Sequence, residues 1–188
     1  MKVTGADIQA WLESSAKRFN RIDPSKTTDQ ALVSNSPGYN FDMFTSPDLR
    51  YEIDVTQPLG SRIRNLNYKG AAIDPNAELI VATNNYRASG GGGFPGLDGS
   101  KTIYASPDTN RDVLIGYIKA VKGLTLATNG SARSWRFTKI TTAGKVTFKS
   151  AAGQLALAQA AGLANVASIN ADDGSGKQIA DYAIDLGQ

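Results

Sequence analysis

The sequence predicts an α+β fold in which mixed sheets pack with about three helices. Three stretches have helical signals, several others have the alternation of strands, and the strands cluster rather than alternating strictly with the helices. The chain has 188 residues, of which 41% are apolar and 20% are charged, as is usual for one globular domain with its own core. We therefore expect residues 1–188 to form a single domain.

The first helix is predicted from a start signal and a spacing. Thr4 and Asp7 form a capping box in which Asp replaces the usual Glu. We expect the helix to end before Asp23-Pro24. The residues whose side chains can face a core recur at helical spacing: Ile8, Trp11, Leu12, Ser15 and Phe19. Residues 23–38 are rich in turn formers and indicate an excursion rather than a domain boundary.

Strands are predicted along the next part of the chain. Apolar and polar residues alternate over 51–55, which is the pattern of a half-buried strand. Residues 63–68 form a second candidate strand, which turns at Lys69-Gly70. The apolar run 79–82 predicts a buried strand that ends at Thr83.

The C-terminal half contains the two remaining predicted helices. One follows Ser106-Pro107-Asp108 and closes at Gly123. Its apolar side chains share one face: Val113, Leu114, Tyr117, Ile118 and Val121. The other is an alanine-rich helix over 151–161, which we expect Ser150 to cap.

Two further strand predictions surround that last helix. Residues 135–140 and 145–148 are expected to pair as a hairpin, and 182–186 alternate as a closing strand. Before the closing strand, Asp172-Asp173-Gly174 has too few ligand positions for a calcium loop and predicts a solvated turn.

A polar segment followed by a glycine cluster is the strongest candidate for a functional site. Gly90–Gly93 supply four successive residues without a Cβ, so the main chain can adopt positive φ and allow another molecule close approach. Long loops at strand ends are commonly functional. Tyr86, which lies where the predicted strand ends, is therefore a candidate flat surface for stacking. Packing of this ring over the edge of the core is the alternative interpretation.

Composition excludes several classes of site. The chain has no Cys and no His, which removes disulfides, thiolate metal sites and the commonest general base at neutral pH. The net charge is only +3 and the basic residues are scattered, so a nucleic-acid-binding stripe is not indicated. No apolar run approaches the roughly 20 residues of a membrane helix. Gly91, Gly93 and Gly96 have the spacing of a dinucleotide-binding motif. That motif must lie at the start of a helix, and Pro95 prevents a helix from forming here.

Five short motifs occur in a fixed order along the chain. They are Asn40-Phe41-Asp42, Ile53-Asp54-Val55-Thr56-Gln57-Pro58, Ile73-Asp74-Pro75-Asn76, Asn84-Asn85-Tyr86-Arg87-Ala88-Ser89-Gly90-Gly91 and Ser106-Pro107-Asp108. Together they resemble the C-terminal domain of the 5'-nucleotidase family, in particular its bifunctional 2',3'-cyclic-nucleotide 2'-phosphodiesterase/3'-nucleotidase branch. The resemblance extends from about Val3 to the final strand.

This resemblance implies nucleotide binding and suggests a role for four residues. Tyr86 takes the position of one of two aromatic residues that sandwich the nucleobase. Gly38 falls where a backbone group approaches the base, and a turn glycine without a ligand is the alternative. Gly92 stands where the 5'-nucleotidase branch often has an acid, so that carboxylate contact is lost. Arg87 can reach a phosphate or a ring nitrogen, unless it is solvated or salt-bridged within the protein.

The resemblance also implies that the chemistry lies elsewhere. In the family, a partner aromatic and phosphate-contacting arginines precede this region, and a divalent metal pair with a catalytic His lies in an N-terminal metallophosphoesterase domain. We therefore expect a fragment with no catalytic residue, no metal and no cofactor of its own. Its expected partners are a nucleotide substrate and that N-terminal domain of the same chain, with neither a nucleic-acid polymer nor a membrane span. The parent hydrolase is expected in the bacterial periplasm or outside the cell.

A binding module of a different class is the alternative function. In this second interpretation the glycine loop contacts a protein or a glycan and has no role in catalysis. Burial of Tyr86 beneath the predicted helix that contains Val113 and Tyr117 would favour it.

Overall fold

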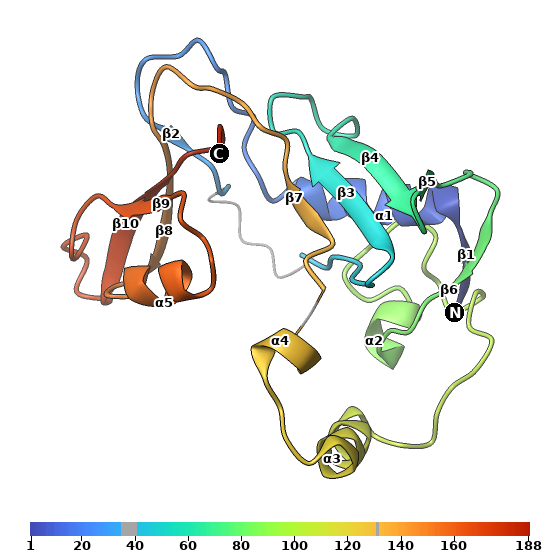
Figure 1. The fold of residues 1–188 in the computed structure, drawn as a ribbon. Helices are drawn as coiled ribbons and strands as arrows, with labels where there is room; N and C mark the ends of the chain where they lie inside the picture. Colours follow the sequence, from blue (N-terminus) through green and yellow to red (C-terminus); the bar gives the residue numbers. More distant parts are fainter. Residues whose placement is uncertain (35–40, 131) are drawn as a thin grey trace. The chain divides into compact units, whose positions relative to one another are not determined.

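The computed structural model describes residues 1–34, 41–130 and 132–188 (Figure 1). Mixed sheets and helices confirm the predicted α+β class. The helices in the described residues are α1 (Gly5–Ala16), α2 (Asn85–Ala88), α3 (Asn110–Val121), α4 (Leu126–Asn129) and α5 (Leu155–Ala160). The strands are β1 (Lys2–Thr4), β2 (Gln30–Ala31), β3 (Leu49–Ile53), β4 (Ile63–Tyr68), β5 (Ala71–Ala72), β6 (Glu78–Ile80), β7 (Trp135–Phe137), β8 (Val146–Ala151), β9 (Val166–Ser168) and β10 (Ile179–Ile184). The short helices α2 and α4 were not predicted.

The described residues fall into two compact units. The first unit takes residues 1–15, 42–51 and 65–135, and the second takes 16–41, 52–64 and 136–188. Each unit draws on three separate segments, so neither is a continuous stretch of sequence. The prediction of a single domain over residues 1–188 stays a prediction.

The capping box at the start of α1 is confirmed. The Thr4 main-chain N–H donates to the Asp7 carboxylate over 2.8 Å, and the Asp7 N–H donates to the Thr4 hydroxyl oxygen over 3.2 Å. The side chains predicted to face the core from this helix are buried: Ile8, Trp11, Leu12 and Ser15. The helix ends at Ala16, so the buried Phe19 lies beyond it.

The two strands predicted after the excursion are also confirmed. Tyr51 and Ile53 in β3 are 2% and 0% exposed, as the alternation requires. β4 pairs antiparallel with β5 across a tight turn at Lys69-Gly70, where both residues have positive φ. The strand order in this sheet is β5-β4-β3-β7.

The prediction of a buried strand over 79–82 was wrong. The strand is β6, which pairs with β1 in a two-stranded sheet, and its Ile80 side chain is 70% exposed. An apolar run shows that a segment favours an extended conformation, but it does not show how many neighbouring strands cover it.

The predicted hairpin over 135–148 was also wrong. β7 joins the sheet of β3, whereas β8 pairs with β2 and β10 in a separate sheet of order β2-β8-β10-β9. The connecting residues bond elsewhere, since the Ile140 N–H donates to the Leu186 carbonyl. Sequence neighbours therefore did not become strand neighbours.

The alanine-rich helix is shorter than expected and has no serine cap. Ser150 lies inside β8, paired with Ala180 of β10, and α5 begins only at Leu155. Pairing with β10 outweighs the helix propensity of the alanines, because strand contacts are set by the tertiary structure. The closing strand was predicted correctly as β10, and its Tyr182 hydroxyl donates to the Ala151 carbonyl over 2.8 Å.

α3 matches its prediction in position but none of its residues is buried. The Asp112 N–H donates to the Thr109 hydroxyl oxygen at its start, and Lys122 is left-handed at its end. Val113 and Tyr117 of the apolar face are 57% and 47% exposed. Across the described part of the chain, no helix has the length and apolar character needed to cross a bilayer.

Arg62 of the second unit is buried among backbone carbonyls. It is 2% exposed, and its Nη1 donates to the carbonyls of Ala16 and Phe19 over 2.9 and 2.6 Å. Its Nε donates to the Gln57 carbonyl over 3.1 Å. The Ala16 carbonyl also accepts from the Phe19 N–H over 3.2 Å. The guanidinium therefore adds a charged donor to this carbonyl and connects the end of α1 with the carbonyls of Phe19 and Gln57.

Replacement of this arginine should therefore destabilise the protein. We expect Arg62→Met to lower the free energy of unfolding by about 1–3 kcal/mol, because three carbonyls lose the hydrogen bonds that this buried guanidinium donates. Arg64→Met is the matched control, since Arg64 lies two residues further along, in β4, and is exposed, and it should change stability by less than about 0.5 kcal/mol. Urea unfolding of both variants measures this, and equal losses would contradict the assigned role.

An exposed ion-pair network lies in the second unit between β8 and β10. The Lys149 ammonium is 2.9 Å from carboxylate oxygens of both Asp173 and Asp181. Hydrogen bonds from Ser175 and from Lys149 lower the pKa of Asp173 from 3.8 to about 2. In the segment predicted as a solvated turn, the carboxylates of Asp172 and Asp173 accept from the main-chain N–H groups of Gly174 and Ser175 over 2.7 and 2.9 Å.

This lowered pKa makes stability depend on pH in an acidic window. A carboxyl group with a lowered folded-state pKa contributes stability above its unfolded value, so the contribution of Asp173 is present above pH 3.8 and is lost as the pH falls toward about 2. Carboxyl NMR titration should show the low pKa, and Lys149→Met should raise it. Lys145→Met, at an exposed position before β8, should leave it unchanged.

Candidate functional site

Tyr86 lies on a single helical turn rather than at a bare strand end. α2 spans Asn85–Ala88, and the Asn84 side chain caps it by accepting a hydrogen bond from the Arg87 N–H over 2.8 Å. The turn ends at Gly90, whose φ is +94°. Asn84 and Gly90 are the start and stop signals that could have predicted this turn from the sequence.

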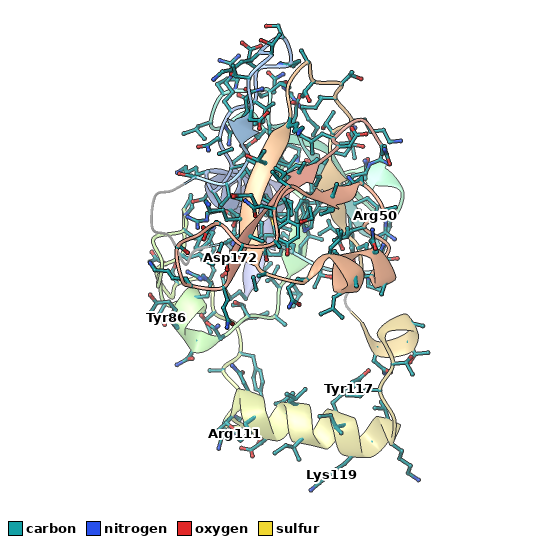
Figure 2. The ribbon with its side chains drawn as sticks, turned by 90° about the vertical axis from the view of Figure 1, so that its left-hand side faces the viewer. Arg50, Tyr86, Arg111, Tyr117, Lys119 and Asp172 are labelled. Carbon is teal, nitrogen blue, oxygen red and sulfur yellow. The ribbon has the colours of Figure 1, made fainter. Side chains whose placement is uncertain are left out.

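The Tyr86 ring is exposed to solvent. It is 63% exposed, and Figure 2 shows it on the turn of α2 in the first unit. Gly91 lies directly against it: a Cβ on Gly91 would be 2.5 Å from the ring atom Cε1 and 2.5 Å from the Tyr86 carbonyl oxygen. The Gly91 N–H donates to that same carbonyl over 2.9 Å. Only glycine leaves room for the ring at this position.

The glycine loop is fixed at both ends. A Cβ on Gly90 would be 2.6 Å from the Leu97 carbonyl oxygen, so the two ends of the loop are in close approach. Phe94 and Leu97 are 4% and 9% exposed, so they anchor the loop in the core of the first unit. Gly92 lies between the anchored ends with φ of +84°, and the loss of a carboxylate contact at this position stays a prediction.

Trp11 connects the loop to α1. Its ring centroid is 5.0 Å from that of Phe94 and 5.0 Å from that of Phe44. Offset and edge-on aromatic pairs at this distance contribute about 0.5–1.5 kcal/mol beyond the area they bury. At the far end of the loop, the Lys101 ammonium is 2.5 Å from the carboxylate of Asp7 on α1.

Arg87 is buried, in contrast to Tyr86 beside it. It is 7% exposed, its Nε is paired with the Asp42 carboxylate, and its Nη1 donates to the Gly91 carbonyl. The Nε–H of this pair is not directed along a hydrogen bond, so the pair is held by charge. The predicted contact of Arg87 with a phosphate or a ring nitrogen stays a prediction. In this structure the guanidinium is engaged within the protein.

Asp42 is a site residue that sequence reasoning did not identify. It belongs to one of the ordered motifs, but nothing in the sequence indicates that it pairs with Arg87. Gly38, the remaining predicted contact, lies outside the described residues.

A metal centre needs several His, Cys, Asp or Glu side chains that converge on one point. Within residues 1–34, 41–130 and 132–188, no group of three or more His, Cys, Asp or Glu side chains is placed to hold a metal ion. The side chains of these described residues therefore do not fit a two-metal centre.

Several known proteins are similar to this chain in sequence. Residues 1–99, just over half of the chain, match the family described as 5'-nucleotidase, C-terminal domain. The trifunctional nucleotide phosphoesterase protein YfkN of Bacillus subtilis is 47% identical over 131 residues, covering 63% of this chain and 9% of that protein. The 2',3'-cyclic-nucleotide 2'-phosphodiesterase/3'-nucleotidase of Haemophilus influenzae is 39% identical over 156 residues, covering 75% of this chain and 23% of that protein.

A solved structure supports the fold. A crystal structure described as a 5'-nucleotidase from Staphylococcus aureus in complex with alpha-ketoglutarate matches with a TM-score of 0.52 and 22% identity, covering 73% of this chain and 26% of that one. The chain thus spans about a quarter or less of the length of each relative. From the match over residues 1–99 and the agreement in fold, the chain belongs to the 5'-nucleotidase C-terminal domain family.

Proposed function

We propose that this chain is the nucleotide-recognition domain of a two-metal phosphoesterase that hydrolyses 2',3'-cyclic nucleotides and 3'-nucleotides. In this proposal Tyr86 stacks on the base, and the divalent metal pair belongs to a separate N-terminal metallophosphoesterase domain. The names of the relatives support the substrate class, since they include 2',3'-cyclic-nucleotide 2'-phosphodiesterase/3'-nucleotidases. A location in the periplasm or outside the cell is part of the same proposal.

The exposure of Tyr86 is the observation that carries the proposal. A stacking residue needs one open ring face and a fixed position. The ring is 63% exposed, while the backbone around it is held by the Gly91 N–H and by the buried Phe94. Burial of this ring would have favoured the alternative, a protein- or glycan-binding module, and the exposed ring gives it no such support.

The chemistry that such a domain performs is selection and orientation. A base stacked on Tyr86 would fix one end of the nucleotide, and the phosphate at the other end would then be presented to a reactive centre outside this chain. Holding a substrate in a productive position accelerates a reaction because the loss of translational and rotational freedom has already occurred on binding.

Removal of the ring tests the proposal directly. We expect Tyr86→Ala to weaken binding of adenosine 3'-monophosphate by about 5- to 150-fold, because stacking contributes roughly 1–3 kcal/mol per base. Tyr86→Phe should keep most of the affinity, since stacking does not need the hydroxyl. Tyr104→Ala is the matched control, because Tyr104 is 74% exposed in the same unit but is not assigned to the site.

Calorimetric titration measures these affinities in the longest natural form of the protein. If Tyr86→Ala bound the nucleotide as tightly as the unchanged protein did, the stacking role would be wrong. Binding of a peptide or glycan that needs the glycine loop would then favour the alternative.

Addition of a methyl group beneath the ring is a second test. We expect Gly91→Ala to displace the Tyr86 ring and to lower the free energy of unfolding by about 1–3 kcal/mol, because the new Cβ would be 2.5 Å from ring and carbonyl atoms. Gly116→Ala is the control, since nothing lies within 4 Å of a Cβ there. Thermal unfolding and the Tyr86 ring signals in NMR report both effects, and an unmoved ring would contradict the packing described.

A further inference from the structure

A buried positive charge next to the proposed stacking residue needs an explanation. Arginine is seldom buried without a partner, because desolvation of its charge costs several kcal/mol in proteins. Arg87 is nevertheless only 7% exposed, although Tyr86 beside it on the same helical turn faces solvent. A residue that binds a phosphate directly would need its guanidinium open to that phosphate, and this one is turned into the protein.

The guanidinium contacts the segment that presents Tyr86 at three points. Its Nη1 donates to the carbonyl of Gly91, the residue packed against the ring. Its Cζ lies 4.4 Å from the centroid of Phe94, the buried anchor of the loop, and 5.6 Å from the centroid of Tyr86. Arginine suits this arrangement because its planar group bonds at its edge and stacks on its faces at the same time.

The counter-charge is itself held in place by α1. The Ser15 hydroxyl, on the buried face of that helix, donates to the Asp42 carbonyl over 2.6 Å. The Asp42 N–H donates back to the same hydroxyl oxygen over 3.0 Å. The Asp42 carboxylate, paired with Arg87, is therefore fixed relative to α1, which also carries Trp11 beneath the loop.

We propose that the Arg87–Asp42 ion pair positions the Tyr86 ring for nucleotide binding. Arg87 acts as a positioning residue through Gly91 and Phe94, and Asp42 fixes Arg87 to α1. Neither side chain contacts the substrate. The expected effect on nucleotide affinity rests on the proposed function. The position of the Tyr86 ring can be measured without any nucleotide.

Charge removal at Asp42 is the first arm of the test. In Asp42→Asn we expect new chemical shifts for the Tyr86 ring and at least about tenfold faster exchange of the Gly91 amide, because the partner that fixes Arg87 has lost its charge. The affinity for adenosine 3'-monophosphate should fall by about tenfold. Asp48→Asn is the matched control, since it makes the same change at an exposed carboxylate of the same unit.

Arg87→Lys is the second arm, and it keeps the test decisive if Asp42→Asn does not fold. Lysine retains the charge but lacks the planar group that reaches Asp42 and Gly91 together, so we expect the same changes in Tyr86 and Gly91 while the amides of β8 and β10 keep their protection. Arg111→Lys, at an exposed position, should change nothing.

The outcomes separate the two proposals. An unchanged Tyr86 ring and unchanged Gly91 exchange in folded variants would overturn the positioning role. Weaker nucleotide binding with an unmoved ring would overturn it as well and would indicate direct contact by Arg87. If both variants move the ring but Tyr86→Ala binds nucleotide normally, the positioning role holds and the proposed function fails.

Discussion

The ion pair between Arg87 and Asp42 is the interaction on which the geometry of the candidate site depends. It connects Arg87, which donates to the Gly91 carbonyl, with Asp42, whose main chain is hydrogen-bonded to Ser15 of α1. The Arg87 side chain is buried, whereas the Asp42 side chain is 38% exposed. Loss of Asp42 would leave the buried Arg87 guanidinium without its counter-charge, which is costly. The pair therefore allows Tyr86 to be exposed and fixed at the same time, although exposed aromatic rings on short turns are usually free to move.

Local signals in the sequence predicted much of the fold. The capping box of α1, the alternation of β3 and the turn between β4 and β5 each depend on residues close together in the chain, and all three were correct. The errors concern contacts between distant segments. β8 pairs with β10 rather than with β7, and that choice depends on which strands are available in the folded protein.

In the candidate site too, local features could be predicted from the sequence, whereas contacts between distant segments could not. Tyr86 and the glycine cluster stood out because an aromatic residue followed by four glycines is an unusual local pattern. The role of Asp42 could not be predicted, since a short motif does not show which distant basic side chain its carboxylate will pair with. The burial of Arg87 was unpredictable for the same reason, because it depends on contacts of the guanidinium with Phe94 and Asp42.

A crystal structure of the longest natural form of the protein with a 3'-nucleotide bound would test the central claim most directly. We expect the base to lie on the open face of Tyr86, with ring centroids roughly 4.5–7 Å apart, and Arg87 to remain paired with Asp42. A nucleotide bound away from Tyr86, or an Arg87 that leaves Asp42 to hold the phosphate, would contradict it.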